Sequence, residues 1–178
     1  KKPNLFSYIL LPLTIPKIIN NLLLAKKKKN KNNEKIKTIC IGNIYLGGTG
    51  KTPTTISLYQ ILKKMNFEVS TAKKFYPAHI DESIILDKKT KFLTESSRKE
   101  ILEKAKKSNQ DLVIFDDGLQ DKSILYDLEF VCFDTDKWIG NGNLIPSGPL
   151  REKLDSLKKT YNYSNTKIRQ HLFKLINI

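Results

Sequence analysis

The feature that most constrains this chain is a glycine-rich loop that joins a short apolar strand to a helical segment. Residues 45–52 read YLGGTGKT, which ends as a Walker A phosphate-binding loop does. In such a loop the backbone N–H groups and the N-terminus of the following helix bind phosphate oxygens. We expect Lys51 to reach the β- and γ-phosphates of a nucleoside triphosphate, and the Thr52 hydroxyl to hold Mg²⁺. A glycine-rich turn that binds nothing is the alternative. The residues predicted to bind the triphosphate are Tyr45, Leu46, Gly47, Gly48, Thr49, Gly50, Lys51 and Thr52.

The loop lies within a pattern of alternating strands and helices. Apolar runs predict strands at residues 38–41, 67–71, 111–115 and 128–133. Periodicity predicts a helix over 52–64, and a capping box formed by Ser97 and Glu100 predicts a second helix that runs to about Lys107. Strands that alternate with helices form parallel sheets with helices on both faces. The predicted fold class is therefore α/β, a P-loop NTPase-like parallel sheet flanked by helices.

Two acidic residues follow the apolar run at 111–115. A carboxylate at the carboxyl end of a parallel strand beside a P-loop is the Walker B arrangement, which orients Mg²⁺ directly or through water. A surface Asp-Asp-Gly turn is the alternative. The predicted metal ligands are Thr52, Asp116 and Asp117, whose separate roles the sequence does not distinguish. Asp117 and Lys51 are also predicted to act in catalysis.

The N-terminal segment is apolar and is followed by a run of lysines. Residues 5–25 approach the roughly 20 residues that span a bilayer, but prolines, asparagines and Lys17 interrupt them. We expect an amphipathic helix that lies in the membrane interface, with a spanning helix or a packed helix as alternatives. Lysines beside such an anchor each gain on the order of 1 kcal/mol from anionic lipid, and they favour the cytoplasmic side. A flexible solvated linker is the other interpretation of these lysines, which are Lys26, Lys27, Lys28, Lys29, Lys31, Lys35 and Lys37.

The net charge of +14 is compatible with nucleic acid, anionic lipid or phosphorylated substrates. The lysines concentrate beside the apolar segment and no nucleic-acid motif is visible, so we expect no nucleic-acid partner. Cys40 and Cys132 lie in apolar runs without metal-ligand spacing, which predicts buried thiols in a reducing cytoplasm. His79 and His171 lie too far apart in the sequence to suggest a zinc site.

Three segments occur in the order typical of one enzyme family. The first is IGN at 41–43 with GGTGKTP at 47–53, the second is DDGLQ at 116–120, and the third is GNGNLIPSGPLRE at 140–152. The apolar LLPL at 10–13 adds a fourth similarity. Together these segments resemble the tetraacyldisaccharide 4'-kinase family of lipid A synthesis. The resemblance implies that the γ-phosphate of ATP, with Mg²⁺, is transferred to the 4'-hydroxyl of a lipid disaccharide 1-phosphate. It also implies a position at the cytoplasmic face of the bacterial inner membrane, peripheral or anchored by the N-terminal helix.

The resemblance further suggests residues that contact the acceptor. The family has an Asp-Glu pair between its second strand and the acidic strand, and Asp81 and Glu82 fit that place. Asp81 is the expected base for the sugar hydroxyl, and Glu82, Gln120 and Arg151 are expected to contact substrate. Two departures stand out. The family usually has Ser-Arg-Gly-Tyr-Gly where residues 73–77 read KKFYP, and usually has His where this chain has Asp121.

The expected organisation has three parts. Residues 1–36 form the membrane-associated helix and basic linker, 37–160 the P-loop kinase core, and 161–178 a divergent tail. The family continues into a second lobe, so the resemblance implies a C-terminally truncated member. A P-loop NTPase of another class and a catalytically incomplete nucleotide-binding fragment remain the alternatives. The oligomeric state is not predicted.

Overall fold

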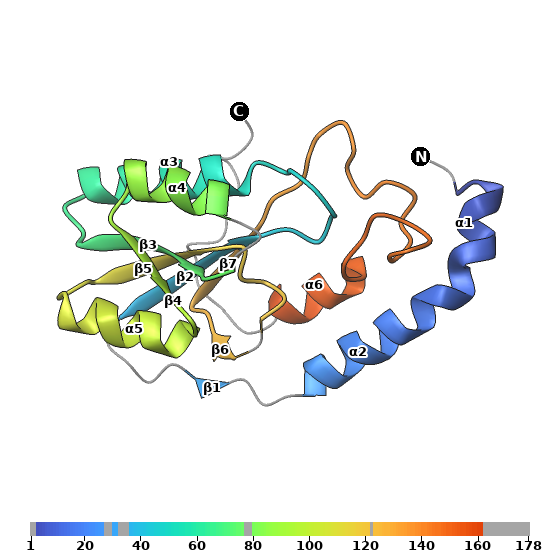
Figure 1. The fold of residues 1–178 in the computed structure, drawn as a ribbon, viewed down its shortest axis with the longest axis horizontal. Coiled ribbons are helices and arrows are strands. Elements are labelled where there is room, and N and C mark those ends of the chain that lie inside the picture. The colour runs from blue at the N-terminus through green and yellow to red at the C-terminus, as the bar shows by residue number, and fades with distance from the viewer. Residues whose placement is uncertain (1–2, 27–29, 32–35, 77–79, 122, 162–178) are drawn as a thin grey trace.

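The core of the protein is a five-stranded, fully parallel sheet with strand order β4-β3-β5-β2-β7 (Figure 1). The computed structural model describes the chain except for residues 1–2, 27–29, 32–35, 77–79, 122 and 162–178. The strands are β2 (Lys37–Gly42), β3 (Val69–Lys74), β4 (Phe92–Glu95), β5 (Leu112–Asp116) and β7 (Leu128–Val131). Because all neighbours are parallel, the carboxyl ends of the strands meet at one edge.

Helices cover both faces of this sheet. On one face lie α3 (Lys51–Lys64) and α4 (Ile80–Lys89), and on the other lies α5 (Arg98–Lys107) (Figure 1). A further helix, α6 (Leu154–Tyr161), follows the 140–152 segment beside the sheet. The alternation of strands and helices requires this layering, since each crossover between parallel strands must pass over one face.

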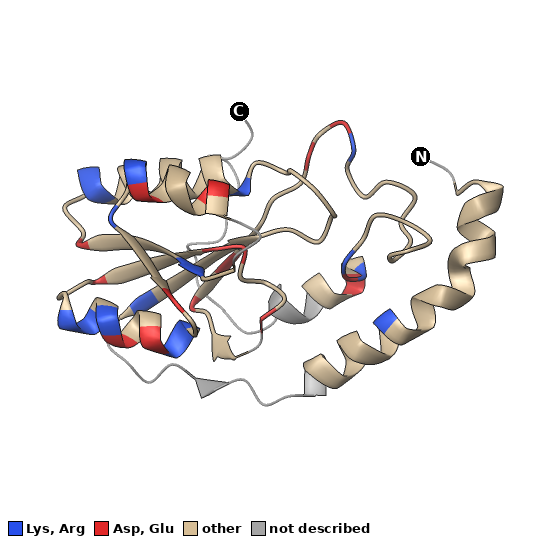
Figure 2. Cartoon of the chain, in the orientation of Figure 1, with Lys and Arg blue, Asp and Glu red and all other residues tan. Residues whose placement is uncertain are grey.

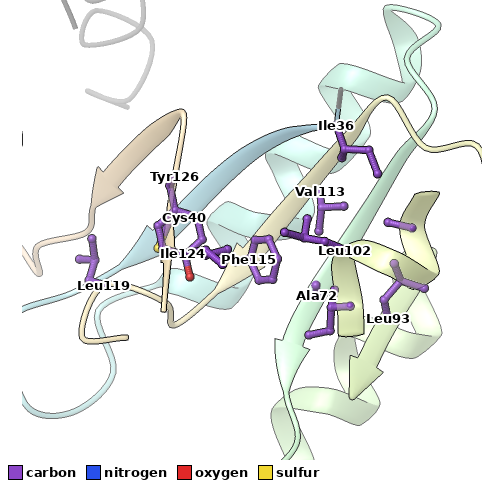
Figure 3. Close-up of a cluster of buried hydrophobic side chains, with 12 residues drawn as sticks. Ile36, Cys40, Ala72, Leu93, Leu102, Val113, Phe115, Leu119, Ile124 and Tyr126 are labelled. Atoms are coloured by element: carbon purple, nitrogen blue, oxygen red, sulfur yellow. The ribbon is translucent and has the colours of Figure 1, made fainter. Parts of the chain in front are cut away.

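Alternate side chains of the strands fill a core on each face. On the α5 face, Val113 and Phe115 of β5 pack with Ile101 and Leu102 of α5 in the cluster that Figure 3 shows. On the α3 face, Ile114 packs in a second cluster with residues of β2, β3 and α3. The apolar run of β5 is therefore buried on both sides, as expected for a central parallel strand.

The predicted α/β parallel sheet is confirmed, but two details of the sequence prediction were wrong. The second strand was expected at 67–71 and lies at Val69–Lys74. Asn66 has φ 63° and the Phe67 amide donates to the Leu62 carbonyl, so these residues end α3 instead of starting a strand. The prediction also missed α4 and β4, because residues 80–95 mix charged and apolar side chains without a clear period.

The strand at 38–41, the helices at 52–64 and 97–107, and the capping role of Ser97 match the structure closely. The Ser97 Oγ accepts from the Glu100 amide at 3.3 Å. Cys40 and Cys132 form no disulfide among the described residues; Cys40 is buried as expected, whereas Cys132, which directly follows the edge strand β7, is only half-buried. His79 and His171 lie outside the described residues.

The N-terminal helical arm consists of α1 (Leu5–Leu10), the 3-10 turn η1 (Leu11–Thr14) and α2 (Ile15–Lys26), and it flanks the α/β body (Figure 1). Its apolar side chains are mostly exposed, including Leu5 at 74% and Phe6 at 72%. By length and composition alone, Leu5–Leu24 is a candidate membrane span, and 11% of its most apolar window is buried. Such low burial is unlike that of a helix packed in a soluble core.

Polar side chains of the arm face the protein. Ser7 and Thr14 are buried, and Asn21 is half-buried, at a spacing of seven residues that places them on one helical face. The Asn21 amide donates to the Arg151 carbonyl at 3.1 Å. The arm thus contacts the body through Ser7, Asn21 and the partly buried Ile18, and it exposes most of its other apolar side chains. Near its C-terminal end, the short strand β1 (Asn30–Lys31) pairs with β6 (Ile124–Leu125). Lys27, Lys28, Lys29 and Lys35 lie outside the described residues.

Candidate active site

The glycine-rich loop leaves β2 at the carboxyl edge of the sheet and enters α3. Gly50 caps the helix with φ 76°, a left-handed conformation that glycine adopts without strain. The buried Asn43 side chain donates to the carbonyls of Tyr45 at 2.7 Å and Gly47 at 3.1 Å. Two carbonyl groups of the loop are therefore hydrogen-bonded to the Asn43 side chain. The loop runs into the N-terminus of α3, which is the position where phosphate-binding loops present backbone N–H groups.

Two side chains of this loop suit a bound anion. Lys51 is 8% exposed, and its Nζ lies 3.7 Å from Asp117 Oδ1. The buried Thr49 hydroxyl has no hydrogen-bond partner among the described residues. A buried hydroxyl without a partner costs free energy unless a ligand or water binds it. Tyr45 is half-buried and Leu46 is exposed, so these two residues border the loop.

Asp116 ends β5 beside the loop, as the sequence predicted. Its carboxylate is fully buried and accepts from the hydroxyls of Thr52 at 3.1 Å and Thr55 at 3.2 Å. Burial raises the pKa of Asp116 above that of an exposed aspartate, while the Lys73 ammonium and the Thr52 hydroxyl oppose the shift. The Thr52–Asp116 hydrogen bond thus joins the Walker A and Walker B elements directly.

The Asp117 carboxylate pairs with two basic side chains, Lys51 and Arg151, and not with the threonines that contact Asp116. Its Oδ1 lies 3.7 Å from Lys51 Nζ and 3.5 Å from Arg151 Nη1. Its backbone carbonyl accepts from the buried Arg98 Nη2 at 3.3 Å. The two neighbouring aspartates therefore differ: Asp116 faces Thr52, and Asp117 pairs with Lys51 and Arg151.

A buried lysine extends the site toward α4. Lys73 Nζ lies 3.4 Å from Asp116 Oδ2 and forms an ion pair with Glu82. Burial lowers the pKa of Lys73, but the charges of Asp116 and Glu82 more than compensate, so its pKa is raised and the ammonium stays charged. Asp81 is the neighbour of Glu82 in the first turn of α4, where its side chain is exposed.

The 140–152 loop connects the phosphate loop to the N-terminal helical arm. The Leu46 amide donates to the Pro149 carbonyl at 2.8 Å, and the Arg151 amide donates to the Ile44 carbonyl at 2.7 Å. On its other side, Ser147 Oγ donates to the Ser7 carbonyl at 2.6 Å. The arm and the phosphate loop are therefore held by the same segment of chain.

Gln120 lies behind the phosphate loop, where its side-chain amide donates to the Asn43 carbonyl at 2.9 Å. This contact supports the base of the loop. Asp121, the residue that departs from the family pattern, forms an ion pair with Arg98. Gln120 thus contacts Asn43 at the base of the phosphate loop, and Asp121 contacts Arg98.

The described residues contain no group of three or more His, Cys, Asp and Glu side chains able to hold a metal alone. Thr52 and Asp116 offer one hydroxyl and one carboxylate oxygen side by side, which are hard oxygen ligands. Mg²⁺ is commonly held by one or two such protein groups with phosphate and water completing its shell. These residues therefore fit a nucleotide-bound Mg²⁺ and do not fit a site built from protein ligands alone.

The sequence predicted a site from the glycine-rich loop and both aspartates, and the resemblance added the Asp81–Glu82 pair. Lys73, Thr55 and Arg98, which contact these aspartates in the structure, were not assigned to the site. Lys73 was visible only as a departure from a family pattern. Thr55 lies one helical turn after Lys51, a spacing that places both on one face of α3. Arg98 follows a capping serine and shows no motif, so nothing in the sequence marked it.

Comparisons with known proteins agree with this geometry. A family model described as Tetraacyldisaccharide-1-P 4'-kinase matches residues 13–167. A tetraacyldisaccharide 4'-kinase of Pelagibacter ubique is 48% identical over 162 residues, covering 91% of this chain and 51% of the relative. A tetraacyldisaccharide 4'-kinase of Rickettsia conorii is 31% identical over 169 residues, covering 85% of this chain and 52% of the relative. The chain thus spans about half the length of these relatives.

Among solved structures, LpxK from Aquifex aeolicus in complex with ATP superposes with a TM-score of 0.70 at 23% identity. The match covers 87% of this chain and 57% of that one. At this identity the similarity concerns the fold, and it agrees with the parallel sheet described above.

Proposed function

Since this chain belongs to the tetraacyldisaccharide-1-P 4'-kinase family, we propose that it binds ATP and acts in phosphoryl transfer to a lipid A precursor. The reaction moves the γ-phosphoryl group from ATP to the 4'-hydroxyl oxygen of a tetraacyl disaccharide 1-phosphate. The bond from the γ-phosphorus to ADP breaks, and the hydroxyl proton passes to a base on the enzyme. The observation that carries the proposal is the Thr52–Asp116 hydrogen bond of 3.1 Å, because it joins the two elements that P-loop kinases require.

ATP is the proposed phosphoryl donor. The phosphate loop supplies backbone N–H groups at the N-terminus of α3, and the nearly buried Lys51 ammonium stands beside it. The unpartnered Thr49 hydroxyl offers one more donor to a phosphate oxygen. Arg151 and Lys51 both lie close to Asp117 Oδ1, at 3.5 and 3.7 Å, so two cations lie together beside the loop, where they would balance the triphosphate charge. In this proposal Asp117 orients the two cations.

Mg²⁺ is the proposed metal, with Thr52 and Asp116 as its protein ligands. When bound, it would neutralise charge on the transferred phosphate. The buried Asp116 carboxylate is held in place by Thr55 at 3.2 Å, which leaves its orientation fixed before any nucleotide arrives. Fixed ligands are favourable because the site then needs little rearrangement on binding.

Asp81 is the proposed base that takes the proton of the 4'-hydroxyl. It is exposed at the first turn of α4, and so is accessible to an acceptor that approaches from outside the protein. Its neighbour Glu82 reaches Lys73, which places this turn beside the Asp116 cluster. A general base must come within hydrogen-bond reach of the hydroxyl that it deprotonates, and in this proposal Asp81 does so when the acceptor is bound. Arg151 and Glu82 remain the proposed substrate contacts, whereas Gln120, which donates to the Asn43 carbonyl, is proposed to support the phosphate loop from behind.

The acceptor carries acyl chains, which suggests docking at a membrane surface. Figure 2 shows a helical arm that is nearly free of charge, with Lys17 as the charged residue between Leu5 and Ala25. Its exposed apolar side chains would gain about 25 cal/mol for each Å² transferred into lipid. The arm is bound to the 140–152 loop through Ser7. We place this surface at the cytoplasmic face of the inner membrane, where the following lysines would meet anionic lipid.

The test measures transfer of labelled γ-phosphate from MgATP to a tetraacyl disaccharide 1-phosphate in detergent micelles. It uses the 178-residue chain and any longer chain encoded by the same reading frame. Labelled lipid from either chain supports the proposal. Phosphate release without labelled lipid would favour an NTPase of another class. ATP binding without any turnover by the 178-residue chain, beside an active longer chain, would identify it as a catalytically incomplete nucleotide-binding fragment.

A further inference from the structure

Lys73 is a charged residue of the site for which the proposed reaction has no role. Its side chain is 4% exposed at the carboxyl end of β3. The ammonium lies 3.4 Å from Asp116 Oδ2 on one side and pairs with Glu82 on the other. An unpaired buried ammonium is strongly destabilising, so these two carboxylates account for its burial.

The two partners of Lys73 belong to different layers of the fold. Asp116 ends β5, which pairs with β2 and β3 in the sheet. Glu82 belongs to the first turn of α4, the helix that also carries Asp81. The Lys73 side chain therefore links the metal-binding carboxylate to the helix turn that carries the proposed base.

This end of α4 has little apolar packing. Leu86 is the buried apolar residue of the helix, whereas Ile80 is 50% exposed and Ile84 is 44% exposed. At the opposite end, the Thr90 hydroxyl lies 2.5 Å from the hydroxyl of Thr71 in β3. The C-terminal half of α4 is thus held by burial and a hydrogen bond, and the first turn by the ion pair with Lys73.

We propose that Lys73 is a positioning residue for phosphoryl transfer, which holds the first turn of α4 against Asp116 and so sets the place of Asp81. This inference rests on the proposed function for the role of Asp81. A short polar side chain such as serine at this place could not reach both carboxylates. The bridge is thus a feature of the lysine in this chain.

The link is tested by hydrogen exchange on the 178-residue chain. Lys73→Met keeps the length of the side chain and removes its charge. We expect amides of the first two turns of α4 to exchange about ten-fold faster, with α5 unchanged, as for loss of a buried contact pair. Lys73→Arg should restore slow exchange. Lys104→Met is the matched control, because Lys104 forms an exposed pair with Glu95 at the end of β4. Equal exchange in Lys73→Met and wild type would overturn the proposal.

A second variant guards against loss of folding. Glu82→Gln breaks the same link at a side chain that is 43% exposed, and it leaves Lys73 paired with Asp116. If Lys73 acts through Glu82, the double variant should exchange no faster than Lys73→Met alone. Additive effects of the two changes would overturn the inference, because they would show independent contributions.

Kinetics separate positioning from mere stability. In the active chain, Lys73→Met should lower kcat about ten-fold or more and leave the apparent Kd of MgATP within about three-fold. Lys73→Arg should recover most of kcat. An equal loss in MgATP affinity and kcat would instead make Lys73 a nucleotide contact and would contradict the proposal. If wild type transfers no phosphate to lipid, the proposed function fails, and the exchange experiment alone decides whether the Lys73 bridge exists.

Discussion

Gly148 lies in the 140–152 loop, where a single added methyl group would disturb the contact between the loop and the N-terminal helical arm. A Cβ at this position would lie 2.1 Å from Asn141 Oδ1 and 2.5 Å from the Asn143 carbonyl oxygen. The Asn143 carbonyl accepts from the Leu150 amide at 3.1 Å and belongs to the backbone, so it cannot rotate away. Gly148→Ala therefore forces the loop to shift.

The cost follows from the groups that must move. Overpacking of a tight site costs about 1–3 kcal/mol. The Asn141 side chain donates to Ser7 Oγ and to the Ser147 carbonyl, both at 2.9 Å. Loss of either bond adds about 1 kcal/mol. We expect Gly148→Ala to lower the free energy of unfolding by about 2–4 kcal/mol, which corresponds to roughly 5–15 °C in Tm for a chain of this size.

The assay is urea unfolding followed by far-UV circular dichroism, with Gly48→Ala as the matched control. A Cβ added at Gly48 would have no other atom within 4 Å. The free energy of unfolding of Gly48→Ala should therefore stay within about 0.5 kcal/mol of the wild-type value. If the free energy of unfolding of Gly148→Ala equals that of wild type, the 140–152 loop does not pack tightly around Gly148, and the predicted clash with Asn141 and Asn143 does not occur.

The remaining predictions concern the site. Lys51→Ala should lower ATP affinity about ten- to hundred-fold by calorimetry without changing the circular dichroism spectrum, since it removes a charged phosphate contact; unchanged affinity would move the site elsewhere. Asp81→Asn should lower kcat about 10²- to 10⁴-fold in the lipid transfer assay with ATP binding retained, as for loss of a general base; unchanged turnover would remove Asp81 from the mechanism. Burial raises the pKa of Cys132, so less of it is thiolate at pH 8 than of a free cysteine, and alkylation should be slow there and accelerate as the pH rises above 9. Alkylation at the rate of free cysteine at pH 8 would contradict that environment.

Local pattern was enough to predict most of the fold and the candidate phosphate loop. The YLGGTGKT loop and the strand before Asp116 are contiguous, so their chemistry can be read without knowing how the chain packs. The prediction was weaker where the secondary structure of a residue depends on its tertiary contacts. The strand after α3 was placed two residues early because Phe67, an apolar residue, ends the helix instead of entering the sheet.

The helical arm shows the same limit. Its sequence predicted an amphipathic helix in the membrane interface, with a spanning helix or a packed helix as the alternatives. The structure adds what the pattern does not contain: Ser7 and Asn21 hydrogen-bond to the body, Ile18 packs against it, and most other apolar side chains of the arm are exposed. Seven-residue spacing of a few polar residues is too common in sequences to have indicated this orientation beforehand.

The sequence by itself determined the kind of sheet, the phosphate loop, the acidic strand end and the likeness to one enzyme family, because each depends on neighbouring residues. The tertiary structure alone decided that Lys73 meets Asp116 and Glu82. Parallel pairing of β3 with β5 sets Ala72 opposite Phe115, so the next residues along these strands, Lys73 and Asp116, lie together at the edge. These residues are 43 positions apart. Such pairing depends on strand order and register, which local propensity does not encode.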